Sequence, residues 1–355
     1  MLVGRAFQGA GAVSAVVMAL VADLTQEVHR TKAMAVIGAS IGLSFGVGIV
    51  LGPIISHFGG VQMVFAATAV LTALAMLSVL YVVPNPQKSK LHRDAEFVPA
   101  QAMSALKNPD LLRLDYGIFV QHLLLMAIFV VIPSLMRQAG LTAGHEWMVY
   151  LPIFATSMAA MIPFIILGEK KRKMKAVFLG AVGILALSTI GLSFLHDDLP
   201  SIIALLWLFF CGFNLLEATL PSLISKTAPA DLKGTAMGAY SSCQFMGLFL
   251  GGVLGGWVNG HYGASMVFLF CGLAALSWFT VSLTMKPPRY LSNLLISLEN
   301  LSDKTIDIFV AQLQKITGVT EVTIHNEEAV AYLKVDSHLL DKVQLQTLLD
   351  EYTNS

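Results

Sequence analysis

Nine stretches of this chain are apolar over a length that can cross a lipid bilayer, and this constrains the fold more than any other feature. A helix rises about 1.5 Å per residue, so about 20 residues cross a hydrocarbon core of about 30 Å. Lipid offers no hydrogen-bond partner to free backbone groups, so each stretch is predicted to be helical. The predicted spans are residues 6–22, 33–55, 61–83, 116–136, 147–168, 176–195, 199–225, 234–260 and 262–285.

The composition supports a membrane protein and gives no sign of an enzyme. Hydrophobic residues make up 56% of the chain and charged residues 12%, which is far from the balance of soluble proteins. The three cysteines, Cys211, Cys243 and Cys271, fall inside predicted spans and are interpreted as buried apolar side chains. No nucleotide-binding loop, nucleophile motif or metal-ligand spacing is present. We therefore expect no enzyme activity, no cofactor, no metal and no nucleic-acid partner.

Lysine and arginine are concentrated in alternate loops. Sixteen of them lie in one set of loops, including "EKKRKMK" at 169–175, whereas the other set contains only Arg137. Basic loops stay on the cytoplasmic side of a membrane. This predicts a cytoplasmic C-terminus and places residue 1 on the opposite side.

The chain contains an internal repeat with an offset of 203 residues. Parallel halves of this kind are one of the architectures of transporters. Spans 116–136, 147–168 and 176–195 lack first-half partners, so about 90 further residues with three spans are expected upstream. A signal peptide at the start is the alternative, but span 6–22 matches span 199–225 in position. The matches that define the offset are Ala33-Met34 with Ala236-Met237, Gly48 with Gly251, and Gly52 with Gly255.

Two motifs resemble signatures of the major facilitator superfamily. "RAFQGAG" at 5–11 is similar to the motif of its fourth helix, and Gly48-x-x-x-Gly52-Pro53 to that of its fifth, although Ser56-His57 replaces the trailing Gly-Gly. Within the superfamily, "KRKMK", "KGTAMG" and the C-terminal soluble domain resemble bacterial YajR-like transporters. The resemblance implies an all-α polytopic membrane protein of the major facilitator fold, with nine of its twelve helices present. It also implies a monomer in the bacterial inner membrane that moves a small molecule by alternating access.

Arg5 is an unusual charge for a membrane span. The resemblance implies that it faces the central cavity and acts on a carboxylate that carries protons. The alternative is that its long side chain reaches the outer membrane interface.

Glu217 is a carboxylate deep inside span 199–225. Such residues usually face the interior of a helix bundle and carry protons or contact substrate. The alternative is a structural hydrogen bond to a neighbouring helix. Asn214 is expected one turn earlier on a similar face, and Gln121 and His122 are further candidates for the cavity. His122 is interpreted either as a proton relay or as a packed, hydrogen-bonded side chain.

The second span carries glycines and a proline suited to close, bendable packing. Gly48, Gly52 and Pro53 are predicted to form a seam that moves as the two halves rock, with tight packing alone as the alternative. Asp23, Glu27 and Arg30 lie at the cytoplasmic end of the first span. The resemblance implies that an acid here latches the two halves on the inside.

The composition changes after Pro287-Pro288, where a small soluble domain is expected. Alternating apolar and polar residues predict strands at 293–299, 319–325 and 329–336. Helices are predicted at 302–318 and 339–352, the first of them capped by Ser302 and ended by Gly318. This order is ferredoxin-like, α+β, without a final strand. It contains no cysteine, and we interpret it as a protein-interaction or regulatory module. The predicted division of the chain is 1–84, 85–110, 111–286 and 290–355.

These features predict a secondary transporter that exports a small molecule in exchange for protons, with membrane lipid and protons as its other partners. A proton symporter or uniporter for a small nutrient is the first alternative. The second is a fragment that does not transport and signals through residues 290–355.

Overall fold

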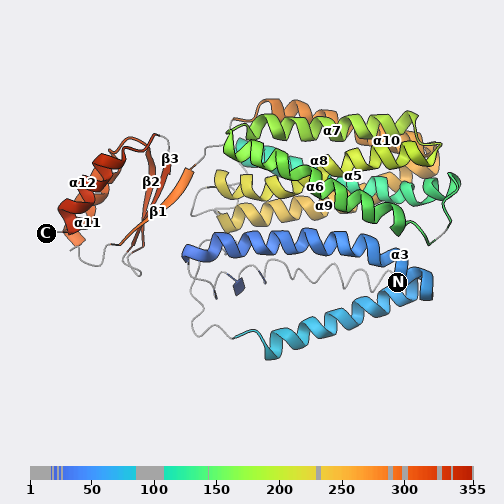
Figure 1. The fold of residues 1–355 in the computed structure, drawn as a ribbon, viewed down its shortest axis with the longest axis horizontal. Helices are drawn as coiled ribbons and strands as arrows, with labels where there is room; N and C mark the ends of the chain where they lie inside the picture. Colours follow the sequence, from blue (N-terminus) through green and yellow to red (C-terminus); the bar gives the residue numbers. More distant parts are fainter. Residues whose placement is uncertain are drawn as a thin grey trace. The chain divides into compact units, whose positions relative to one another are not determined.

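The computed structural model divides the chain into two compact units, Met1–Pro287 and Pro288–Ser355 (Figure 1). It describes residues 17, 20–21, 24, 27–84, 108–142, 144–228, 233–286, 291–297, 303–325, 330–336 and 339–353. Most of the predicted span 6–22 lies outside these residues, as do Arg5, Asp23 and the side chains of Glu27 and Arg30.

The first unit is helical. Among the described residues, seven helical segments are long and apolar enough to cross a membrane. The helices are α3 (Glu27–Tyr81), α5 (Pro109–Gln138), α6 (Trp147–Lys170), α7 (Met174–Phe194), α8 (Leu199–Thr227), α9 (Lys233–Tyr262) and α10 (Ala264–Leu283). The six from α5 onward cover the spans that the sequence predicts.

Helix α5 begins seven residues before the predicted span. Asn108 caps it, because its side chain accepts a hydrogen bond from the Asp110 backbone N–H at 2.9 Å, and Pro109 occupies the first turn. The predicted linker 85–110 therefore ends earlier, and Asp115 lies within the helix rather than beside it.

Helix α3 is broken at Gly59 and Gly60, between the predicted spans 33–55 and 61–83. Gly60 has a φ of 66°, a conformation that glycine adopts without strain. Pro53 lies inside the first segment. A Cβ atom at Gly48 or Gly52 would meet nothing within 4 Å in the described part of the chain, whereas one at Gly46 would collide with the Phe154 ring. The role of Gly48 and Gly52 as a moving seam therefore stays a prediction.

Helices α5 and α9 pack through a row of glycines on α9. Cβ atoms at Gly247 and Gly251 would collide with the carbonyl oxygens of Phe119 and Leu123, and one at Gly255 would lie 2.7 Å from the Cα of Ala127. The offset is the same at each position, so the two helices run parallel with their backbones in contact. Helix α5 also packs on α8 and α10.

The loop between α5 and α6 is held by an ion pair. Arg137 donates a hydrogen bond to Glu146 at 3.0 Å, and the backbone N–H of Gly144 donates to the other carboxylate oxygen at 2.8 Å. Gly144 has a φ of 85°, which favours glycine. Burial alone would raise the pKa of Glu146, but the hydrogen bonds from the backbone and Arg137, with the charge of Arg137, bring it below its ordinary value.

This lowered pKa predicts a loop that loosens in acid. A carboxyl group with a lowered pKa in the folded state stabilises the fold above its ordinary pKa, and loses this effect as the pH falls through the folded value. The Arg137 side chain is 46% exposed, so solvent screens the pair and the effect is at most about 1 kcal/mol. Relative to the intrinsic exchange rate at each pH, the amides of residues 139–146 should lose protection on acidification, and Glu146→Gln should show this low protection at neutral pH already. Equal exchange in the two proteins at neutral pH would contradict the prediction.

The second unit is a small α+β fold. Its elements are β1 (Leu291–Ser297), α11 (Asp303–Leu313), β2 (Val319–His325), β3 (Val330–Asp336) and α12 (Lys342–Thr353). The sheet order is β1-β3-β2, and β3 is antiparallel to both neighbours, so β1 and β2 are parallel with β3 between them. This is a split βαβ arrangement. Helix α11 ends five residues before the predicted limit, because the chain turns toward Gly318, whose φ is 93°.

The core of this unit forms between the sheet and the two helices. It includes Ile296, Phe309, Leu313, Leu333 and Val335. Phe309 is 1% exposed and packs against Tyr352 of α12 with ring centroids 4.8 Å apart.

We expect residues 288–355 to fold alone and to depend on Phe309. Phe309→Ala should lower the free energy of unfolding by about 3–5 kcal/mol, because it leaves a cavity between α11 and α12. Ile308→Ala is the matched control, since Ile308 is 57% exposed and its loss should change stability by less than about 0.5 kcal/mol. Urea unfolding followed by circular dichroism measures both. A random-coil spectrum of the wild-type fragment, or equal effects of the two variants, would contradict the prediction.

Candidate functional site

Glu217 lies within α8, ten residues before the helix ends. This distance corresponds to about 15 Å, which is half the thickness of a hydrocarbon core. Gln121 of α5 donates a hydrogen bond from Nε2 to Glu217 Oε2 at 2.9 Å, and also contacts the Phe213 carbonyl at 3.3 Å. The Glu217 side chain is 24% exposed. The carboxyl group thus contacts α5 and remains accessible from the surface of the unit.

His122 faces the same carboxyl group, with its Nε2 atom 3.7 Å from Glu217 Oε2. Its Nδ1 atom lies 3.2 Å from the carbonyl oxygen of Ile118, which can only accept, so Nδ1 carries the hydrogen. Nε2 then accepts from the side-chain nitrogen of Gln244 on α9 at 2.8 Å. His122 is thereby fixed between α5, α8 and α9 in one tautomer.

This geometry is suited to hold one proton. The lone pair on His122 Nε2 and an ionised Glu217 would repel, and a proton on either group turns the repulsion into attraction. Gln244 can serve both states, because rotation of its amide presents either a donor or an acceptor to the imidazole. The site can therefore exist with a protonated carboxyl group or with an imidazolium–carboxylate pair.

Asn214 belongs to a different contact. Its amide donates to Ser157 Oγ of α6 at 2.9 Å. Three residues rotate the direction of a helical side chain by about 300°, so Asn214 and Glu217 diverge by only about 60° around α8. Asn214 nevertheless bonds α6 whereas Glu217 contacts α5, so Gln121, His122 and Glu217 come together and Asn214 does not join them.

The structure adds polar groups that the sequence did not single out. Gln244 and Ser157 are uncharged residues of a common type, and nothing in the sequence marked them. Asp115 falls just before the predicted span 116–136, although Asn108-Pro109 is a signal for a helix start before it. Asp115 is 5% exposed and Tyr240 4%. Within the described chain, Asp115 Oδ1, Gln121 Oε1 and the Tyr240 hydroxyl have no hydrogen-bond partner.

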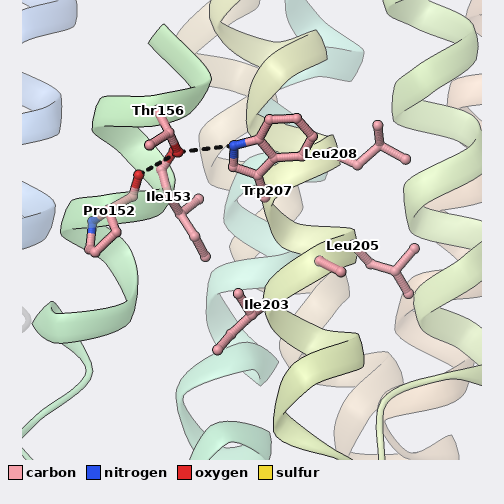
Figure 2. A pocket seen from close by; sticks show the side chains of 8 residues that line it. Pro152, Ile153, Thr156, Ile203, Leu205, Trp207 and Leu208 are labelled. Atoms are coloured by element: carbon pink, nitrogen blue, oxygen red, sulfur yellow. Dashed lines mark hydrogen bonds between the residues drawn. The ribbon is translucent and has the colours of Figure 1, made fainter. Parts of the chain in front are cut away.

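A recess of about 490 Å³ lies between α6 and α8 (Figure 2). The indole N–H of Trp207 donates to the Thr156 hydroxyl at 3.0 Å, and that hydroxyl donates to the Pro152 carbonyl at 2.6 Å. Trp207 and Asn214 are seven residues apart, so they share a face of α8, and their partners Thr156 and Ser157 are neighbours on α6. The lining contains no charged side chain and consists of Pro152, Ile153, Thr156, Ile203, Ala204, Leu205, Trp207 and Leu208.

No group of three or more His, Cys, Asp or Glu side chains in the described ranges is placed to hold a metal ion. The polar cluster instead consists of proton-binding and hydrogen-bonding groups on three helices. A polytopic helical membrane protein with such a cluster at mid-membrane depth has the architecture of a secondary transporter.

Comparison with known proteins gives the family. The model of the Major Facilitator Superfamily matches residues 1–252, and the chain belongs to this superfamily of membrane transporters. It is 42% identical over 346 residues to the inner membrane transport protein YajR of Escherichia coli (strain K12), covering 97% of this chain and 76% of that protein.

Two further similarities are more limited. The chain is 31% identical over 141 residues to the multidrug resistance protein MdtH of Aeromonas hydrophila, which is 39% of this chain and 32% of the relative. The crystal structure of the human organic anion transporter MFSD10 superposes with a TM-score of 0.56 at 19% identity, covering 76% of this chain and 67% of that one. This last similarity concerns the fold alone.

Proposed function

We propose that the chain acts as a secondary transporter in which Glu217 binds and releases the proton that drives export of a small molecule. The observation that carries this proposal is the contact of Glu217 with Gln121 and His122 at mid-membrane depth, combined with its 24% exposure. The similarity to an inner membrane transport protein supports a bacterial inner-membrane location. The distribution of basic loops supports a cytoplasmic C-terminus.

Coupling follows from the electrostatics of the site. An ionised carboxyl group within a membrane is unfavourable unless a proton or another cation neutralises it. The substrate competes with the protonated Glu217 for the same hydrogen-bonding groups. The site can therefore hold either a proton or a substrate molecule, and the transporter exchanges one for the other. Each ligand then favours the conformation to which it binds more tightly, and the two conformations alternate.

The recess between α6 and α8 is the proposed contact for the apolar part of the substrate. Its lining carries no charge, and the polar atoms of Trp207 and Thr156 already bond each other. Asn214 and Ser157 connect it along the α6–α8 seam with the part of α8 that carries Glu217. The name of the MdtH relative as a multidrug resistance protein supports export.

The test uses inverted membrane vesicles with an acidic interior and an entrapped pH-sensitive dye. Small uncharged and cationic organic compounds are added outside, on the face that corresponds to the cytoplasm. Exchange moves protons out as the compound enters, so the interior becomes more alkaline. Symport would make the interior more acidic, and uniport would leave its pH unchanged, so either result would overturn proton-coupled export.

A further inference from the structure

A second buried carboxyl group, Asp115, lies on α5 and has no role in the proton-binding site described so far. It precedes His122 by seven residues, so both side chains share a face of α5 at a separation of about 10 Å along the axis. Asp115 is 5% exposed, and its Oδ1 atom has no hydrogen-bond partner among the described residues. Buried polar atoms without protein partners are places where internal water binds.

Helix α9 covers this face of α5. Tyr240 and Gln244 are one turn apart on α9, so they also share a face. Gln244 bonds His122 directly, and the Tyr240 hydroxyl, one turn before it, is buried and has no partner in the described chain. Asp115 is four residues before Phe119, which touches α9, so the polar groups of the two helices lie where α5 and α9 pack together, with Glu217 of α8 next to His122.

Other titratable groups around Asp115 are few. Helix α9 adds Cys243, and the described part of α10 contains one titratable side chain, Cys271. At the start of α5, Asp110 is paired with Arg113 at 2.6 Å and is partly exposed. Charged groups therefore lie at the start of α5, while the helix interior beyond them carries proton acceptors and donors.

We propose that Asp115 is the residue through which the proton passes between Glu217 and the side of the membrane on which α5 begins. During export, Glu217 passes its proton to His122, which becomes an imidazolium. The proton then moves through water held by the Gln244 amide and the Tyr240 hydroxyl to the Asp115 carboxylate, and His122 returns to the neutral form. Asp115 releases the proton to that side and is ionised again, so one proton is moved and no other group changes. The same path runs in reverse when the medium on that side is made acidic. This pathway rests on the proposed role of Glu217.

The experiment follows carboxyl protonation by infrared difference spectroscopy, after a pH jump, in the full chain reconstituted in lipid nanodiscs. Glu217→Gln assigns the band of protonated Glu217. Asp115→Asn keeps the shape of the side chain and should slow the appearance of this band by at least about tenfold without removing it. Asp115→Glu should restore the wild-type rate. Asp110→Asn is the matched control on the same helix and should leave the rate unchanged.

The outcomes separate the pathway from the site. If Glu217→Gln removes no band, the proposed function fails and the pathway fails with it. If the Glu217 band appears at the wild-type rate in Asp115→Asn, the pathway alone is overturned. Gel filtration and thermal unfolding show whether Asp115→Asn folds. If it does not fold, Tyr240→Phe is used to test the pathway instead. Loss of that one hydroxyl should slow the Glu217 band severalfold, and an unchanged rate would overturn the pathway.

Discussion

Proton-driven flux in Glu217→Gln is expected to fall at least about a hundredfold, whereas exchange of substrate in the absence of a gradient should persist in part. The substituted amide keeps the length of the side chain and still accepts the hydrogen bond that Gln121 donates at 2.9 Å. It cannot bind and release a proton, so the site stays in the neutral state. The vesicle assay with the pH-sensitive dye measures the proton movement. Equilibrium exchange of the compound measures the substrate exchange that should persist without a gradient.

Glu146→Gln is the matched control, because it makes the same change at a carboxyl group in the loop between α5 and α6. Glu146 lies outside the Gln121–His122–Glu217 cluster, paired with Arg137. Flux in this variant should keep the wild-type dependence on the gradient. Wild-type pH dependence of flux in Glu217→Gln would exclude Glu217 as the proton carrier and leave it a structural hydrogen-bond acceptor.

The helices of the first unit were predictable, because the length and apolar character of a membrane span are physical requirements that every span must meet. The residues at which these helices begin and end were less predictable. Apolar patterning marks where lipid contact begins, but a cap such as Asn108-Pro109 marks where the helix begins. For this reason the apolar pattern leaves Asp115 outside the predicted span, although it is the seventh residue of α5.

The candidate site was predictable only as separate residues. Gln121, His122 and Glu217 stand out because polar side chains are rare within spans. Their convergence depends on how α5 and α8, whose contacting residues are 96 positions apart, pack in three dimensions. The same packing gives Asn214 and Glu217 different partners, because α8 lies between α6 and α5 and the two side chains, which diverge by about 60°, each reach a different neighbour. Gln244 came from a third helix, and only the fold brings it to His122.

Gly251→Leu is expected to have the largest effect on the fold, with a loss of more than about 4 kcal/mol in the free energy of unfolding. A Cβ atom there would collide with the Leu123 carbonyl oxygen and lie 2.8 Å from the Leu123 Cα. These are backbone atoms of α5, so no side chain can rotate away, and the two helices must separate. Separation would also break the 2.8 Å contact between Gln244 and His122, which lies next to the glycine row.

Gly256→Leu provides the control for this prediction, since a Cβ atom at Gly256 would meet nothing within 4 Å in the described part of the chain. Both positions lie on α9, five residues apart, and both substitutions add the same apolar side chain and the same helix propensity. A difference between them therefore measures the close contact of α5 with α9 and nothing else. Thermal unfolding and the monodisperse fraction in detergent should be close to wild type for Gly256→Leu and strongly reduced for Gly251→Leu. The smaller pair Gly251→Ala and Gly256→Ala should show the same order, and equal melting of that pair would mean that α5 and α9 are not in backbone contact.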